Sequence, residues 1–149
     1  MKLRIAALSP NDWEWVCEQV PILLVEDTSG LVGFDDETGE RVCAAVFDNW
    51  TNTSVQTHMM LTNPMALRHG FMEFCTDFMF NDQGKKVAYG LVPSDKEKAI
   101  KFNNHLGFSE VMRFEDGYDD GIDYIVMEMK KADCKYLPEP NTLKAAEMV

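Results

Sequence analysis

Short apolar runs alternate with clusters of turn-forming residues along most of this chain. Runs of about four to eight residues that are rich in aliphatic and aromatic side chains predict β-strands when Gly, Pro, Asn or Asp bound them. Such runs occupy residues 2–8, 22–25, 31–34, 41–47, 54–61, 86–92, 109–114 and 122–129. Because turn clusters separate the runs between residues 22 and 61, we expect an antiparallel meander in this part of the chain.

Three other segments place apolar residues three or four positions apart, which is the spacing of one face of a helix. The first segment covers residues 10–19, and Pro21 ends it. The second is one long amphipathic helix that begins near Leu67 and ends before the turn cluster at 81–84. Its apolar stripe is expected to pack in the core and consists of Leu67, Phe71, Phe74, Cys75 and Phe78.

The third helix has the clearest boundaries, because a start signal and a stop signal flank it. Ser94 and Glu97 have the spacing of a capping box, in which each side chain accepts a hydrogen bond from a free backbone N–H at the helix start. Gly107 stands where a helix end needs a residue with positive φ, so that Phe108 can fold back onto Phe102. We therefore expect a well-defined helix between strands 86–92 and 109–114.

This order of elements predicts an α+β fold with a mixed, mostly antiparallel sheet. One parallel pair is required, because the long helix after strand 54–61 must return the chain to strand 86–92 by a crossover. Residues 1–131 are expected to form a single domain. Residues 132–149 are expected to be a tail of uncertain order with a short helical stretch at 142–148.

Composition and charge exclude several classes of function. The chain has 149 residues and a net charge of −11, which argues against nucleic acids and anionic membranes because both bind a basic face. No apolar run is long enough for a membrane span or a signal peptide, so we expect the protein in the cytoplasm. The 4 cysteines and 3 histidines lack the spacing of a zinc site, and no metal is expected.

The segment from Lys96 to Phe108, KEKAIKFNNHLGF, resembles the late helix and Leu-Gly-Phe stop of the GNAT superfamily of N-acetyltransferases. The order of elements over residues 1–130 is similar to the order in that family. The chain as a whole resembles the small phage-encoded members of the family. The resemblance implies a central sheet, flanked by helices, that splays at its one parallel strand pair. It also implies an N-acetyltransferase that transfers the acetyl group of acetyl-CoA directly to a primary amine.

The resemblance further implies where acetyl-CoA binds. Its pantetheine arm would pair with the edge of strand 54–61, and the backbone N–H near Met60 or Leu61 would polarise the thioester carbonyl. Its pyrophosphate would lie at the start of the next helix, where Arg68, His69 and Gly70 stand in the family's phosphate loop. Free backbone N–H groups and the helix dipole favour an anion at such a position.

Four positions depart from the family's pattern. In the phosphate loop, Leu67 replaces a basic residue and Met72 replaces a small one, and the Met72 side chain is expected to crowd a backbone approach. Lys96 stands where the family usually has Asn. Asn103 stands where the family often has a tyrosine that protonates the departing thiolate. A thiol with a pKa of about 8.5 can leave without that acid, and Asn103 could instead hydrogen-bond the sulfur or the pantetheine.

His58 is the best candidate for the base that deprotonates the attacking amine. It lies in the strand beside the expected thioester, and an imidazole titrates near neutral pH. The alternative is a half-buried structural histidine. His69 flanks the phosphate loop and could meet a phosphate, and His105 lies in the last helical turn, where a cation is favourable.

Several alternatives stay open at the level of sequence. The acidic turn at 115–121 could recognise a cationic amine or could be a solvated turn. A group of lysines could contact the phosphates of acetyl-CoA or cover a solvated helix face: Lys85, Lys86, Lys96, Lys98 and Lys101. The acceptor is a small-molecule or peptide amine of unknown identity, and the oligomeric state is open, a homodimer included. The alternative to an enzyme is a catalytically silent binding or structural protein with a GNAT fold.

Overall fold

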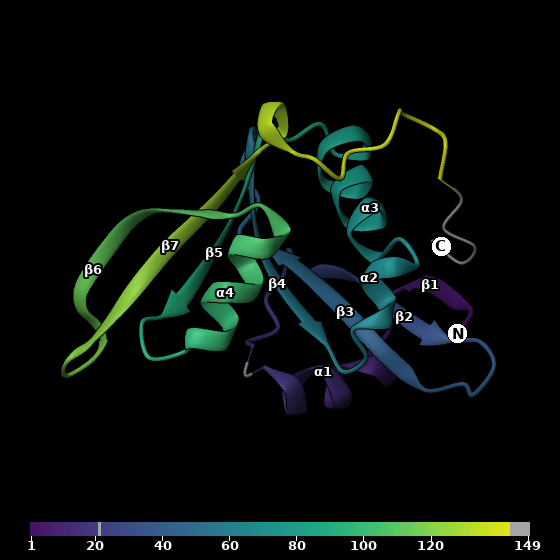
Figure 1. Cartoon of the computed structure of the whole chain (residues 1–149), viewed down its shortest axis with the longest axis horizontal. Coiled ribbons are helices and arrows are strands. Elements are labelled where there is room, and N and C mark those ends of the chain that lie inside the picture. The colour runs from purple at the N-terminus through teal and green to yellow at the C-terminus, as the bar shows by residue number, and fades with distance from the viewer. Residues whose placement is uncertain (21, 144–149) are drawn as a thin grey trace.

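The computed structural model describes residues 1–20 and 22–143 and contains one seven-stranded sheet with helices around it (Figure 1). The strands are β1 (Leu3–Ala7), β2 (Ser29–Asp35), β3 (Arg41–Asp48), β4 (Ser54–Leu61), β5 (Val87–Pro93), β6 (Ser109–Asp119) and β7 (Ile122–Lys130). The α-helices are α1 (Trp13–Gln19), α2 (Met65–Arg68), α3 (Phe71–Thr76) and α4 (Glu97–Leu106). This mixture of elements confirms the predicted α+β class.

The sheet has the strand order β1-β2-β3-β4-β5-β7-β6, and only β4 and β5 are parallel neighbours among the described strands. Their pairing begins at Ser54↔Val87 and ends at Gln56↔Tyr89, although both strands continue. Figure 1 shows the two halves of the sheet meeting at this pair and opening from it, with α4 in front of the gap. The predicted parallel crossover and the splay at that pair are both confirmed.

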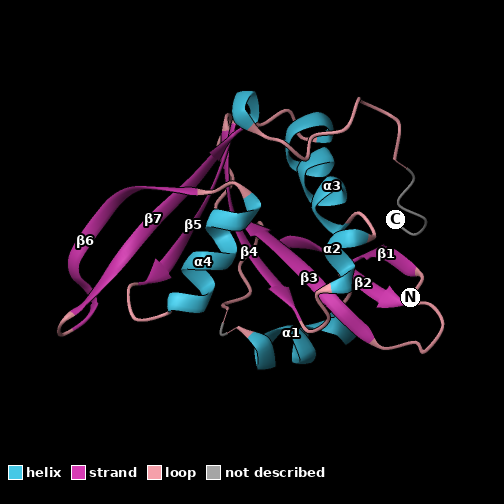
Figure 2. Cartoon of the chain, viewed as in Figure 1, coloured by secondary structure: helices cyan, strands magenta, loops and turns pink. Residues whose placement is uncertain are grey.

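The two faces of the sheet carry separate apolar clusters. On one face, Val16 of α1 packs with Ala44 and Val46 of β3 and with Met60 of β4. On the other face lies the larger cluster, to which α2, α3 and α4 contribute. Figure 2 shows these three helices on the viewer's side of the strands. Because side chains alternate along a strand, neighbouring residues of β4 face different clusters.

The expected single helix from Leu67 to Phe78 is wrong, because the helix is broken. α2 ends at Arg68, Gly70 has φ +94°, and α3 begins at Phe71. A left-handed residue cannot continue a right-handed helix, so Gly70 turns the chain between the two pieces. α3 then runs into a π-helical turn at Asp77–Asp82. The expected burial of the stripe holds best for Phe71 and Cys75, which are both fully buried.

The predicted strand at residues 22–25 is also wrong. This segment has no strand structure, and the side chains of Leu23 and Leu24 are 83% and 65% exposed. The next predicted run, 31–34, lies in β2, which begins at Ser29 and includes Gly30. A Cβ atom at Gly30 would lie 2.6 Å from the carbonyl oxygen of Ala45, so a glycine is needed for this close approach of β2 to β3. Pro21, the predicted helix stop, lies outside the described residues.

The start of α4 differs from the prediction, whereas its end agrees with it. The capping box is wrong: the Ser94 hydroxyl accepts a hydrogen bond from the backbone N–H of Asp123 at 2.8 Å, and α4 begins at Glu97. At the other end Gly107 has φ +106°, and the Phe108 N–H donates to the carbonyl oxygen of Asn103 at 2.9 Å. This is the predicted glycine stop, and it turns Phe108 into the core.

Part of the C-terminal segment packs on the domain. The Thr76 hydroxyl donates to the carbonyl oxygen of Tyr136 at 3.1 Å, and the Asn81 amide donates to that of Pro138 at 3.0 Å. The helical stretch predicted at 142–148 lies mostly outside the described residues, and a domain boundary at residue 131 stays a prediction. In the part of the chain that the structure describes, no helix has the length and apolar character of a membrane span.

Candidate active site

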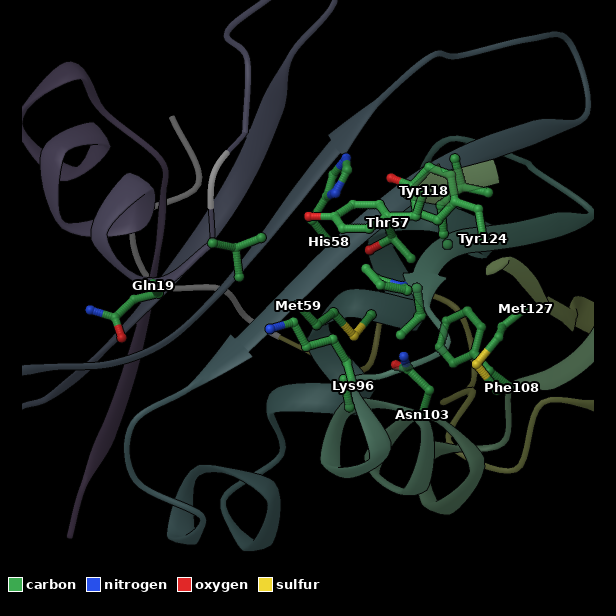
Figure 3. A pocket seen from close by; sticks show the side chains of 16 residues that line it. Gln19, Thr57, His58, Met59, Lys96, Asn103, Phe108, Tyr118, Tyr124 and Met127 are labelled. Atoms are coloured by element: carbon green, nitrogen blue, oxygen red, sulfur yellow. The ribbon is translucent and has the colours of Figure 1, made fainter. Parts of the chain in front are cut away.

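A pocket of about 580 Å³ lies where β4 and β5 part (Figure 3). Both strands contribute to its wall, together with α1, α4 and the β6–β7 hairpin. Its lining residues are Gln19, Val20, Thr57, His58, Met59, Gly90, Leu91, Val92, Pro93, Lys96, Ala99, Asn103, Phe108, Tyr118, Tyr124 and Met127. The predicted residues His58 and Asn103 therefore lie in one pocket, although they are far apart in sequence.

The pocket reaches both faces of the sheet. His58 lies opposite Val46 in the β3–β4 register, and Val46 belongs to the cluster on the α1 side. Met59 packs against the larger cluster on the α4 side. Residues from α1 and α4 both line the pocket, so it forms a passage through the gap between the strands. Two molecules that approach from opposite faces could meet there.

His58 is held by a carboxylate that the sequence analysis did not single out. Asp48 ends β3 and lies opposite Gln56 of β4. His58 follows Gln56 by two residues, so all three side chains stand on the same face of the sheet. The Nε2 atom of His58 is 3.1 Å from both carboxylate oxygens of Asp48. Asp48 is 9% exposed, so this contact is largely shielded from water. When the ring is neutral, Nε2–H donates to Asp48 and the lone pair is on Nδ1.

Two tyrosines complete the wall on the His58 side. Tyr124 alternates in β7 with Ile125, which is buried in the α4-side cluster, so Tyr124 faces the other side. The ring of Tyr118 lies 5.4 Å from that of Tyr124 at an angle of 58°. Burial raises the pKa of the Tyr124 hydroxyl, and the neighbouring Tyr118 raises it further. Figure 3 shows both rings next to His58.

These tyrosines were missed because residues 115–121 were interpreted as an acidic turn. β6 in fact extends to Asp119, and the turn is confined to residues 120–121. A regular hairpin that continued from the pair Asp119↔Ile122 would place Tyr118 and Tyr124 on different faces. The register shifts between Phe114 and Asp119, and this irregularity accompanies the contact of the two rings. No signal in the sequence predicts that shift.

Helix α4 supplies the wall on the opposite side. Lys96, which precedes the helix, and Asn103 both line the pocket with Ala99 between them. Figure 3 shows the amide group of Asn103 and the side chain of Lys96 on the α4 side of β4. Two of the four positions that depart from the family's pattern, Lys96 and Asn103, thus lie in the pocket.

The predicted phosphate loop lies after β4, at the break between α2 and α3. Arg68 and His69 are exposed there, next to Gly70. Met72 is fully buried, so its side chain is turned into the core and leaves the exposed side of the loop free, contrary to the expected crowding. None of Arg68, His69 and Gly70 lines the pocket.

Met60 and Leu61 follow the pocket residues of β4. Met60 is 5% exposed in the α1-side cluster, and Leu61 packs against the larger cluster. They lie on the strand between the pocket and the α2–α3 break. No group of three or more His, Cys, Asp or Glu side chains that could hold a metal occurs within residues 1–20 and 22–143.

Comparison with known proteins gives matches in structure but not in sequence. No protein-family model matches the chain, and no curated protein matches its sequence. The spermidine/spermine N-acetyltransferase SpeG from Vibrio cholerae, solved in complex with manganese ions, has a TM-score of 0.71 with 11% identity, over 88% of this chain and 94% of that chain. SpeG from the same organism in complex with CoA and spermine has a TM-score of 0.67 with 13% identity, over 92% and 99%.

A point mutant of the same Vibrio cholerae enzyme superposes with a TM-score of 0.73 and 15% identity, over 92% of this chain and 97% of that chain. These superpositions cover at least 88% of this chain and at least 94% of each other chain. At sequence identities of 11–15%, this structural similarity establishes the fold and nothing further. The chain therefore has the fold of the GNAT N-acetyltransferases, as the resemblance of Lys96 to Phe108 implied.

Proposed function

We propose that this protein is an N-acetyltransferase that transfers the acetyl group of acetyl-CoA to a primary amine. The observation that carries this proposal is the passage of about 580 Å³ through the splayed sheet, with His58 on one face and Asn103 on the other. A donor and an acceptor that bind on opposite faces can react in this passage without a covalent enzyme intermediate.

The donor would bind on the α4 side. Beyond the pair Gln56↔Tyr89, the edge of β4 that turns away from β3 has no β5 partner, so its backbone groups can pair with pantetheine as with an added strand. Met60 and Leu61 lie on this edge and are assigned to pantetheine and to the thioester carbonyl. Arg68, His69 and the Gly70 backbone are assigned to the pyrophosphate, because they are accessible where this edge ends.

The acceptor would bind on the α1 side, where His58 acts as the base. Its Nδ1 atom takes the proton of the amine while Nε2–H stays bonded to Asp48, which holds the ring and stabilises its protonated form. The amine nitrogen attacks the carbonyl carbon, the C–N bond forms and the C–S bond breaks. The sulfur leaves as the CoA thiolate, to which the Asn103 amide can donate a hydrogen bond from the other face.

The acceptor is proposed to be a small-molecule or peptide amine. The net charge of −11 favours the approach of a cation, and one structural neighbour was solved with CoA and spermine. Another neighbour is described as dodecameric, and a homodimer of the present chain stays a prediction. The cytoplasmic location and the similarity to phage-encoded members stay predictions as well.

A second candidate is a GNAT-fold protein that binds acetyl-CoA, or another ligand, without catalysis. The observation that favours it is Asn103, which lies in the pocket without the acidic hydroxyl that the family often has there. The two candidates differ in one measurable property, because both bind a ligand but only the enzyme releases CoA when an amine is present.

Thermal denaturation with and without acetyl-CoA tests the proposal first. A ligand at one hundred times its dissociation constant adds roughly 2.7 kcal/mol to the free energy of unfolding. CoA release is then measured with spermidine, tyramine and a lysine peptide as acceptors. No thermal shift at millimolar acetyl-CoA would contradict the proposal, whereas a shift without CoA release for any amine would favour the binding protein.

A further inference from the structure

The side-chain oxygen of Thr57 is buried without a hydrogen-bond partner. Thr57 is 6% exposed, and its hydroxyl is the one buried side-chain group among residues 1–20 and 22–143 that bonds to nothing in the protein. A buried hydroxyl without a partner costs free energy, because it has given up its hydrogen bonds to water. Since Thr57 also lines the pocket, a ligand bound there can reach this residue.

Thr57 stands at the point where the sheet opens. The last β4–β5 pair is Gln56↔Tyr89, and Thr57 is the next residue of β4. In the β3–β4 register Thr57 lies opposite Phe47, whose ring packs 5.1 Å from that of Phe78 on the α3 side. Thr57 therefore faces the side of the sheet on which α4 lies, and its neighbour His58 faces the other.

Gly90 of β5 and Asn103 of α4 line the pocket together with Thr57. A Cβ atom at Gly90 would lie 3.2 Å from the Thr57 carbonyl oxygen, a close contact, so the lack of a side chain at Gly90 lets the two strands stay near each other here. Across the pocket, α4 presents Asn103, which can donate and accept hydrogen bonds. Figure 3 shows Thr57 between the His58 side and the Asn103 side of the pocket.

We propose that the Thr57 hydroxyl binds the thioester end of the acyl donor and donates a hydrogen bond to its carbonyl oxygen. This inference rests on the proposed function. As the amine attacks, negative charge develops on that oxygen, and a donor held in a site shielded from water stabilises it. No proton is transferred from Thr57. Met60 stands about 10 Å further along β4 than Thr57, so under this inference Thr57 bonds the thioester carbonyl and the backbone of Met60 and Leu61 bonds the pantetheine arm.

The proposal predicts opposite effects on stability and on catalysis, which a structural threonine would not give. Thr57→Val keeps the shape and removes the unpaired hydroxyl, so its melting temperature should equal or exceed that of the wild type. Its kcat should fall by about 100-fold, the lower end of the effect of losing one oxyanion donor. Thr57→Ser keeps the hydroxyl and should retain kcat within a few fold. The affinity of both variants for CoA, which lacks the acyl group, should be unchanged.

Three results would overturn the inference. Equal kcat for the wild type and Thr57→Val would mean that the hydroxyl binds only water. A lower melting temperature of Thr57→Val, with kcat lost equally in Thr57→Ser, would mean that the residue serves the fold. Failure of the wild type to bind acetyl-CoA or to release CoA would remove the proposed function as well. Only this last failure is seen with the wild-type protein, and it contradicts the proposed function. A failure of the Thr57 inference alone is seen only when the variants are compared with an active wild type.

Discussion

His58 and Asp48 form a contact between neighbouring strands, in which Nε2 of the imidazole lies 3.1 Å from each carboxylate oxygen. The side chain of Asp48 is 12% exposed and that of His58 is 23% exposed, so the imidazole is the more accessible partner. This arrangement fixes the ring orientation and directs Nδ1 away from the carboxylate. In the proposed chemistry, His58 therefore accepts the proton of the amine through Nδ1.

Replacement of His58 should remove most of the transferase activity. His58→Gln keeps a polar side chain but cannot accept a proton at neutral pH, so kcat should fall by about 10²–10⁴-fold, the usual effect of losing a general base. The affinity for acetyl-CoA, measured by calorimetry, should change little because His58 faces the acceptor side. Unchanged turnover in His58→Gln between pH 6 and 9 would contradict the assignment.

Asp48→Asn should lower kcat with little effect on CoA binding. The Asp48 carboxylate accepts the hydrogen bond from Nε2–H of His58 and so fixes the orientation and the tautomer of the ring. The amide group of asparagine can donate to Nε2 instead, which favours the tautomer with its proton on Nδ1 and removes the lone pair that the mechanism needs. The fall in kcat should approach that of the His58 variant, while the dissociation constant of CoA, measured by calorimetry, stays the same. Circular dichroism of the D48N variant checks that its fold is intact, and an unchanged kcat would contradict the role of Asp48.

Arg68 should contribute to CoA binding through its charge. If it contacts the pyrophosphate, Arg68→Ala should raise the dissociation constant of CoA about 10-fold, as expected for the loss of a hydrogen bond to a charged group. Arg113→Ala is a matched control, because it also removes one arginine charge. Arg113 is paired with Glu110 and Asp123 on the β6–β7 hairpin, so its loss should leave CoA binding unchanged. The difference between the two variants should shrink at high salt. Equal affinities would remove Arg68 from the site.

The glycine stop of α4 should contribute to the stability of the fold. At Gly107, φ is +106°, and an added Cβ would make only ordinary contact with Met129, at 3.5 Å. Gly107→Ala should therefore lower the free energy of unfolding by about 1 kcal/mol through backbone strain rather than through a clash. Gly107→Asn should cost less, because Asn tolerates the left-handed region. Urea denaturation measures both, and equal costs would contradict this explanation.

Burial of Cys43 should make stability fall in alkaline solution. Burial raises the pKa of the Cys43 thiol from 9.0 to about 12. Above pH 9 the unfolded chain releases this proton and the folded protein keeps it, so unfolding becomes more favourable by about 1.4 kcal/mol per pH unit up to pH 12. The stabilising contribution is thus complete below pH 9. Cys43→Ala should show a smaller alkaline loss in urea denaturation than Cys17→Ala, and an identical loss would contradict the burial argument.

The sequence was most informative where structure depends on neighbouring residues. Strand β4 has the predicted bounds, Ser54–Leu61, because a run of β-forming residues between turn clusters is a local signal. The stop at Gly107 was predicted for the same reason, since a helix end that needs positive φ selects glycine. The resemblance of Lys96 to Phe108 then led to the GNAT fold, which the structural comparisons support over almost the whole chain.

What failed or was missed depends on contacts between distant segments. Ser94 and Glu97 have the spacing of a capping box, but the Ser94 hydroxyl binds the backbone of Asp123 in another strand instead. Leu23 and Leu24 belong to a run typical of a strand, yet that run forms no strand. Local propensity is a weak preference, and contacts with other parts of the fold can outweigh it.

The pattern of residues along the chain was enough to predict the class of fold and the position of the one parallel pair. The roles of His58 and Asn103 stay predictions, although both residues line the pocket. The folded arrangement was needed to place Asp48 beside His58, to bring Tyr118 and Tyr124 to the pocket and to leave the Thr57 hydroxyl without a partner. These relationships follow from strand register, which sets the residue that lies opposite each position and the face on which it stands. Register depends on which face of each strand is buried and on the geometry of the turns, and both are settled only when the strands pair in the fold.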